Sequence, residues 1–272
     1  MPDLGALATN LGATLGTALV TVLVAFAIGV TRQRHRIIDV FWGLGFVAVA
    51  GGGLALSAGH GDPGRRWLVT AMVAVWGLRL AIHIGWRGWG EPEDPRYEAL
   101  LARARGHRQV YALRMVYALQ GVTLWFISWP VQVAQYDAAA PGPLAYAGLA
   151  VWGVGLTFEA VGDAQLANFR ADPDNRGRVL DSGLWHYTRH PNYFGDACVW
   201  WGLWLVAAGS WLGLATVVCP LTMTYLLTRK TGKPLLEAQL ARTRPGYADY
   251  VARTSGFVPW APRRAGSPPR SS

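Results

Sequence analysis

One stretch of the chain runs from a dense polar motif directly into an apolar segment: Trp185-His186-Tyr187-Thr188-Arg189-His190-Pro191-Asn192-Tyr193-Phe194-Gly195-Asp196, followed by Ala197-Cys198-Val199-Trp200-Trp201-Gly202-Leu203-Trp204. The ring of Pro191 suits the first turn of a helix, which would place Asn192 and Asp196 one turn apart on one face. Polar groups beside a membrane segment are costly unless a partner or ligand satisfies them. The stretch therefore predicts a membrane helix with a ligand site at its mouth.

Long apolar runs recur along the rest of the chain, which has 272 residues, 52% of them hydrophobic, and 14 Trp. Runs of about 20 apolar residues with few charges are typical of transmembrane helices. The sequence predicts an all-α integral membrane protein of about seven spans. The last two are short and could form a tight hairpin or a bent pair. The expected spans are 12–30, 37–58, 67–84, 111–135, 143–167, 193–209 and 211–228.

The basic residues alternate with these spans. They gather after the first, third and fifth spans and in the C-terminal tail, whereas the loops on the other side hold only Arg65 and Arg66. By the positive-inside rule, the N-terminus is expected outside and the C-terminus in the cytoplasm. The net charge of +9 is then mostly cytoplasmic loop charge, and its distribution argues against nucleic-acid binding.

The chain is expected to form a single membrane domain over residues 1–262, with its polar content concentrated in the C-terminal half. Residues 263–272, which are rich in Arg, Ser, Pro and Gly, are predicted to be a disordered tail. Cys198 and Cys219 both lie in apolar runs, so neither a disulfide framework nor a metal site is expected.

Two polar clusters flank the opening motif. Glu159, Asp163 and Arg170 share one face of the fifth span, which should point into the bundle because carboxylates avoid lipid. The alternative is a structural seam that pairs with an arginine of a neighbouring helix. Arg170 also begins an arginine-rich loop that includes Arg178, and guanidinium groups match phosphate oxygens in fork geometry. Such a loop could instead contact lipid headgroups.

Another basic cluster, with Arg229 and Glu237, follows the last span, and ordinary basic flanking of a membrane helix is its alternative interpretation. In the N-terminal half, Asp39 lies just inside the second span, His83 near the end of the third and Tyr117 within the fourth. An intramembrane Asp is by default a functional candidate. Asp39 could alternatively form an ion pair with Arg34 or Arg36, and His83 could be a satisfied interfacial histidine.

The segments Tyr187–Asp196, Phe158–Asp163 and Arg253–Trp260 together resemble the steroid 5α-reductase family, most closely its bacterial branch, long labelled a domain of unknown function. The resemblance covers most of the chain and is strongest over about 150–260. It implies a seven-helix fold of a bacterial inner membrane, with NADPH in a cavity open to the cytoplasm. The C-terminal half would hold the cofactor and the N-terminal half the substrate. The implied reaction reduces a carbon–carbon double bond conjugated to a ketone, in a steroid-like or other lipid substrate.

The same resemblance implies specific site residues. Those expected around NADPH are Asp163, Arg170, Arg178, Tyr187, Asn192, Asp196 and Arg229. Glu159 and Glu237 are expected there too, although the steroid reductases have Asn and Tyr at these positions. The family also places a Glu and a Tyr over the substrate carbonyl. The chain has no clear equivalent of that pair, and the candidate catalytic set is Asp39, Tyr117 and His83.

Part of the opening motif, Arg189-His190-Pro191-Asn192-Tyr193-Phe194-Gly195, is also similar to membrane methyltransferases. These enzymes act on isoprenylcysteine or phospholipid amines and use S-adenosylmethionine. Their signature continues with adjacent Glu residues, whereas here Leu236 precedes a single Glu237. The arginine cluster favours a phosphorylated cofactor and hence the reductase. A non-catalytic membrane binding protein is the third interpretation.

Overall fold

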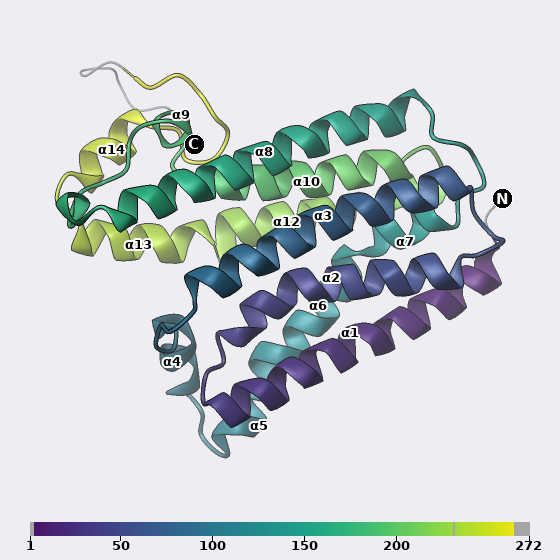
Figure 1. Cartoon of the computed structure of the whole chain (residues 1–272), viewed down its shortest axis with the longest axis horizontal. Coiled ribbons are helices and arrows are strands. Elements are labelled where there is room, and N and C mark those ends of the chain that lie inside the picture. Colours follow the sequence, from purple (N-terminus) through teal and green to yellow (C-terminus); the bar gives the residue numbers. More distant parts are fainter. Residues whose placement is uncertain (1–2, 231, 264–272) are drawn as a thin grey trace. The chain divides into compact units, whose positions relative to one another are not determined.

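A computed structural model describes residues 3–230 and 232–263, which fold into helices joined by turns (Figure 1). The elements in chain order are α1 (Leu4–Arg32), α2 (Ile37–Leu56), α3 (Pro63–Arg87), α4 (Pro95–Leu101), α5 (Arg108–Ala112), η1 (Leu113–Ala118), α6 (Leu119–Ile127), α7 (Trp129–Gln135), α8 (Pro143–Ala171), η2 (Pro173–Asn175), α9 (Leu184–Tyr187), α10 (Pro191–Ala207), α11 (Trp211–Ala215), α12 (Val218–Tyr225), η3 (Leu226–Lys230), α13 (Lys233–Thr243) and α14 (Tyr247–Arg253).

The all-α membrane fold predicted from the sequence is confirmed. Within the described residues, six helical segments are long and apolar enough to cross a membrane: Leu4–Arg32, Ile37–Leu56, Pro63–Arg87, Arg108–Ile127, Pro143–Ala171 and Trp211–Lys230. The sixth predicted span, 193–209, corresponds to α10, which has 17 residues. At about 1.5 Å per residue, such a helix falls short of a hydrocarbon core of about 30 Å. The difference in count therefore comes from the length of α10.

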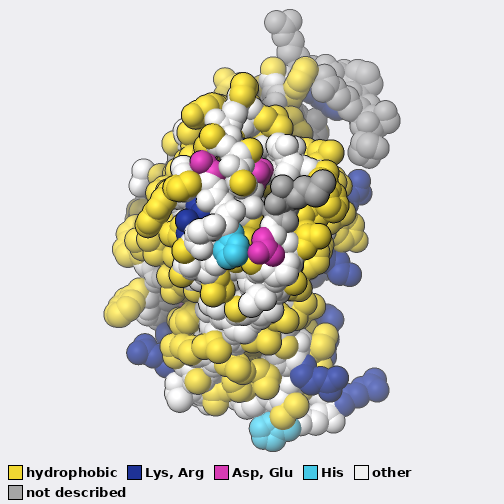
Figure 2. Space-filling view, turned by 90° about the vertical axis from the view of Figure 1, so that its right-hand side faces the viewer, with side chains coloured by type: hydrophobic (Ala, Val, Ile, Leu, Met, Phe, Trp, Pro, Cys, Tyr) yellow, Lys and Arg dark blue, Asp and Glu magenta, His cyan; other side chains and the backbone are white. Residues whose placement is uncertain are grey.

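Large apolar side chains are exposed along these helices. Val20, Trp67 and Ile82 have exposed fractions of 61%, 64% and 70%. Figure 2 shows hydrophobic side chains over much of the visible face, with most Lys and Arg side chains at its edges. Exposed apolar surface of this kind is expected where helices contact lipid.

The chain divides into two compact units, Met1–Ala147 with Leu203–Cys219, and Gly148–Gly202 with Pro220–Ser272. In the first unit, α1, α2 and α3 run side by side (Figure 1). The helices α2 and α3 approach closely at Gly77, because a Cβ added there would lie 2.7 Å from the Gly43 carbonyl oxygen. Small residues allow such backbone contact between membrane helices. The short helix α7 is tied to α1 by Gln132, whose Oε1 accepts hydrogen bonds from Asn10 at 3.0 Å and Thr14 at 2.6 Å.

The fourth predicted span, 111–135, is broken in the structure. It begins within α5, continues through the π-helix η1 and α6, and ends at Ser128, after which α7 starts. Pro130 lies in the first turn of α7. A proline lacks the amide hydrogen that would continue the preceding helix, and its ring clashes with the preceding turn. The single long helix predicted for this region is therefore wrong beyond Ile127.

In the second unit, α8 and α10 pack with their backbones in close contact. A Cβ added to Gly195 would lie 2.5 Å from the Gly155 carbonyl oxygen, and one added to Gly202 would lie 2.6 Å from that of Gly148. The two glycines of each helix are seven residues apart and so lie on one face. This packing holds the carboxylate face of α8 against the N-terminal end of α10, where Asn192 lies.

The segment before α10 pairs with the end of the described chain. Thr188 and Ser255 form an isolated β-bridge, and the Trp260 amide donates to the Tyr187 carbonyl at 3.0 Å. The Trp185 indole donates to the Gly162 carbonyl of α8 at 3.0 Å. These bonds fix the opening motif from both sides.

The predicted disordered tail, 263–272, lies outside the described residues except for its first residue.

Candidate functional site

Arg189 is a buried, firmly anchored charged residue of the second unit. Its Nε donates to Oε1 of Glu237 at 2.9 Å, and its Nη1 donates to the carbonyls of Thr254 at 2.7 Å and Val251 at 3.1 Å. Only 9% of its side chain is exposed. A buried guanidinium with a carboxylate and two carbonyl partners is satisfied and fixed in position. Arg189 therefore organises the site and positions Glu237.

His190 contacts the same carboxylate. Its Nε2 lies 3.0 Å from Oε1 of Glu237, and its ring stacks on Tyr193 at a centroid separation of 5.3 Å. Burial lowers the pKa of His190 below 6.5, although Glu237 opposes that shift. A neutral ring that donates from Nε2 leaves Nδ1 as an acceptor. This buried Nδ1 has no hydrogen-bond partner among the residues that the structure describes.

Glu237 completes the cluster as an ionised group. Burial alone would raise its pKa, but the hydrogen bonds from His190 and Arg189 outweigh burial and lower the pKa of Glu237 to about 2. The charge of Lys233, at the start of α13, acts in the same direction. The cluster thus consists of a neutral histidine and a guanidinium that both contact one oxygen, Oε1, of the ionised Glu237.

Some of the predicted cofactor residues lie together beside this cluster. The Asn192 amide donates to Asp163 Oδ1 at 3.2 Å. Asp163 and Glu159 are buried on α8, with 5% and 3% of each residue exposed. Asp196 is half-buried on α10, one turn after Asn192. The packed helices α8 and α10 therefore bring four of the predicted residues to one region of the second unit.

Four further predicted cofactor residues are exposed, whereas Glu237 is partly buried in the cluster described above. Arg170 lies in the last turn of α8, Arg178 in the loop after η2, and Arg229 in η3. Tyr187 closes α9 with 47% of its surface exposed. Exposed guanidinium groups on three elements of one unit suit the several phosphate oxygens of a dinucleotide. The chemistry of this donor set fits NADPH.

The first unit contains the residues predicted to be catalytic. Asp39 pairs with Arg96, whose Nη2 lies 3.1 Å from Oδ2. Its partner is therefore not Arg34 or Arg36, the ion pair that the alternative interpretation of Asp39 expected. The Tyr97 hydroxyl donates to Oδ1 of Asp39. Burial and then the charge of Asp39 raise the pKa of Tyr97, so this hydroxyl keeps its proton.

Tyr117 has a separate partner, since its hydroxyl lies 2.9 Å from Nδ1 of His35. Tyr117 and Tyr97 belong to the same buried apolar cluster. His83 is half-buried in α3. The structure therefore places Tyr117 in the same cluster as the tyrosine that contacts Asp39.

Sequence reasoning missed two parts of these arrangements. Arg189 and His190 were part of the quoted motif but were not assigned to the site, although they are the adjacent residues that hold Glu237. Tyr97 carried no sequence signal that linked it to the site, because it lies 58 residues from Asp39, in the short helix α4. Only folding brings that hydroxyl to the carboxylate.

Comparisons with known proteins agree with the resemblance predicted from the motifs. A family model described as "Protein of unknown function (DUF1295)" matches residues 25–254. The chain is 32% identical over 87 residues to "3-oxo-5-alpha-steroid 4-dehydrogenase 1" of Rattus norvegicus, a match that spans 32% of each chain. No solved structure matches. The family model covers most of the chain and both units, so the chain belongs to the DUF1295 family, which is similar to the steroid 5α-reductases.

Proposed function

We propose that the protein is a membrane-embedded reductase that uses NADPH to reduce a carbon–carbon double bond conjugated to a ketone in a steroid-like or other lipid substrate. Family membership and the rat relative named as a steroid dehydrogenase support a membrane reductase. The observation that carries the cofactor assignment is the Asn192–Asp163 pair beside the Arg189–His190–Glu237 cluster.

The second unit supplies the groups that a dinucleotide needs. Asn192 and Asp163 offer a donor and an acceptor for a ribose hydroxyl or a carboxamide. Arg170, Arg178 and Arg229 offer exposed guanidinium groups for phosphate oxygens. When bound, NADPH would supply the hydride that the β-carbon of the enone accepts. The residues of this unit would bind the cofactor and orient it. Glu237, which is held by Arg189 and His190, would keep the N-terminal end of α10 in place.

The first unit supplies a candidate for the second half of the reaction. Saturation of an enone adds a hydride at the β-carbon and a proton at the α-carbon, and negative charge develops on the carbonyl oxygen between the two events. A tyrosine hydroxyl that turns from its carboxylate partner to the substrate can donate a hydrogen bond to that oxygen and stabilise its charge. We assign this role to Tyr97 with Asp39, in place of a set built on Tyr117 or His83.

Ligand titration of the detergent-purified protein tests the cofactor. We expect NADPH to raise the melting temperature, NADH to bind much more weakly because it lacks the 2′-phosphate, and S-adenosylmethionine to have no effect. Arg178→Gln and Asn192→Ala should reduce the NADPH effect. Arg176→Gln changes an exposed arginine of the same loop and serves as the control. Stabilisation by S-adenosylmethionine alone would overturn the reductase, and equal affinities for NADPH and NADH would remove the arginines from phosphate recognition.

A further inference from the structure

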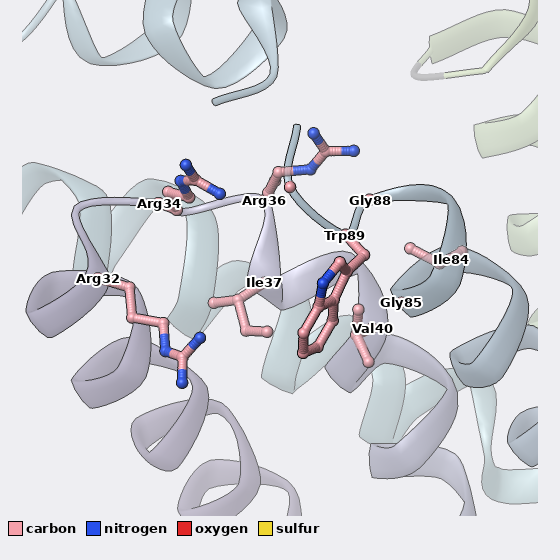
Figure 3. Close-up of a pocket in the computed structure, with 10 residues that line it drawn as sticks. Arg32, Arg34, Arg36, Ile37, Val40, Ile84, Gly85, Gly88 and Trp89 are labelled. Carbon is pink, nitrogen blue, oxygen red and sulfur yellow. The ribbon is translucent and has the colours of Figure 1, made fainter. Parts of the chain in front are cut away.

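The first unit contains a cavity of about 410 Å³ where α1 ends, α2 begins and α3 ends (Figure 3). Its lining contains three arginines: Arg32, the last residue of α1, and Arg34 and Arg36, which lie between α1 and α2. Ile37 and Val40 of α2 and Trp89, which follows α3, supply apolar surface. The cavity therefore combines positively charged side chains with an apolar wall.

The arginines have capacity for an anionic ligand. Within the part of the chain that the structure describes, the guanidinium groups of Arg32 and Arg34 have no ion pair or hydrogen bond. Arg36 is steadied by its Nη1, which donates to the Pro92 carbonyl at 2.8 Å. Glu93, the carboxylate of the same segment, accepts from the backbone amides of His35 and Arg36. Because Glu93 bonds to backbone amides, it leaves the guanidinium groups available to an anionic ligand.

The apolar wall indicates that the ligand also has a hydrocarbon part. The Trp89 ring lies between Ile37 and Val40, and the guanidinium groups of Arg34 and Arg36 lie on the other side of the loop (Figure 3). Trp89 is 85% exposed, although an indole of that size is among the most costly side chains to leave in water. Its exposure is expected if the ring contacts lipid at the level of the headgroups.

The position of the cavity at the ends of membrane-spanning helices favours a lipid as the source of the anionic group. All three helices that border the cavity are long and apolar enough to cross a membrane. Arg32 lies in the last turn of α1, and Arg34 and Arg36 lie between α1 and α2. A ligand here would meet the headgroup layer, where guanidinium groups attract phosphate.

We propose that this cavity binds an anionic phospholipid of the surrounding bilayer. Its phosphate would be held by Arg34 and Arg36, and Arg32 would add positive charge on the other side of the loop. The start of an acyl chain would lie along Ile37, Val40 and Trp89. This inference concerns residues outside the proposed cofactor and hydrogen-bond donor sets, so it does not depend on the reductase assignment.

Lipid titration tests the proposal. The protein, purified in a neutral detergent, is titrated with phosphatidylglycerol or phosphatidylcholine, and bound lipid is counted by native mass spectrometry. We expect preferential binding of phosphatidylglycerol that is weakened about tenfold or more in the Arg32→Gln/Arg34→Gln double variant. The matched control, Arg103→Gln/Arg105→Gln, removes the same charge from exposed positions between α4 and α5 and should bind like the parent.

A second pair of variants tests the apolar wall. Trp89→Ala should weaken phosphatidylglycerol binding, whereas Trp86→Ala, an exposed tryptophan outside the cavity, should not. Inorganic pyrophosphate tests whether a soluble phosphate compound occupies the cavity, and we expect that it does not displace the lipid. The proposal would be overturned if both arginine double variants weakened lipid binding equally, or if the two lipids bound equally. Displacement of the lipid by pyrophosphate in a manner that depends on Arg32 and Arg34 would also overturn it. Melting temperatures without lipid identify any variant that fails to fold, and the tryptophan pair then decides.

Discussion

The Nε2 atom of His190 lies 3.0 Å from Oε1 of Glu237, the same oxygen that Arg189 contacts at 2.9 Å. One carboxylate oxygen thus joins the polar motif before α10 to the helix α13. Because Arg189 also binds the carbonyls of Val251 and Thr254, the cluster links three separate segments of the second unit.

Glu237→Ala should destabilise the second unit strongly, because it leaves the buried guanidinium of Arg189 without its counter-charge. Removal of one partner of a buried ion pair costs about 3–5 kcal/mol, and we expect the lower end because Glu237 is partly exposed. Glu237→Gln, which keeps a hydrogen-bonding oxygen, should cost less. Asp249→Asn alters an exposed carboxylate of α14 and is the control. Thermal unfolding in detergent measures all three, and equal losses for Glu237→Ala and Asp249→Asn would contradict the expectation.

The same cluster predicts a pH dependence. The folded-state pKa values of His190 and Glu237 both lie below the ordinary values of 6.5 and 4.5, that of Glu237 at about 2. The unfolded chain therefore binds protons that the folded chain does not, and stability falls on acidification. The loss due to His190 begins below pH 6.5, and that due to Glu237 runs from pH 4.5 towards 2. The stability difference between the parent and Glu237→Gln should shrink over this lower range, whereas a constant difference would exclude the mechanism.

The membrane fold was predictable because it depends on local composition. Apolar runs of sufficient length identify α1, α2, α3 and α8 without any knowledge of their partners. The break at Ser128 was less evident, since Pro130 lies within an apolar run and only its local effect on hydrogen bonding separates α6 from α7.

The site was predictable only where its residues are close in sequence or share a helix face. Asn192 and Asp196 follow from helical spacing, and the carboxylates of α8 follow from the same period. The contacts of Glu237 with Arg189 and of Asp39 with Tyr97 cross 48 and 58 residues. Such pairings depend on tertiary packing, which no local pattern encodes.

The glycines of α8 offer a direct test of helix packing. Gly155→Ala should destabilise the protein by about 2–3 kcal/mol, because overpacking a close helix contact forces the backbones apart. The added Cβ would lie 2.5 Å from the Gly195 carbonyl oxygen. Gly153→Ala is a matched control on the same helix, where a Cβ meets nothing within 4 Å. This control should be neutral or stabilise by about 0.5–1 kcal/mol, since Ala is the better helix former. Equal unfolding temperatures for the two variants would argue against the close approach.

The last prediction separates binding from chemistry in the proposed reduction. Tyr97→Phe removes the hydroxyl that donates to Asp39, and Asp39→Asn removes the charge of its partner. Loss of one transition-state hydrogen-bond donor typically lowers kcat by about 10²–10³-fold, so we expect a fall of that order for Tyr97→Phe on an enone lipid substrate. NADPH affinity, measured by titration without substrate, should stay unchanged in both variants because neither residue belongs to the second unit. Tyr117→Phe removes the hydroxyl that contacts His35 and should leave most of the rate. If Tyr117→Phe abolished turnover while Tyr97→Phe did not, the hydrogen-bond donor role would belong to Tyr117, a member of the candidate catalytic set predicted from the sequence.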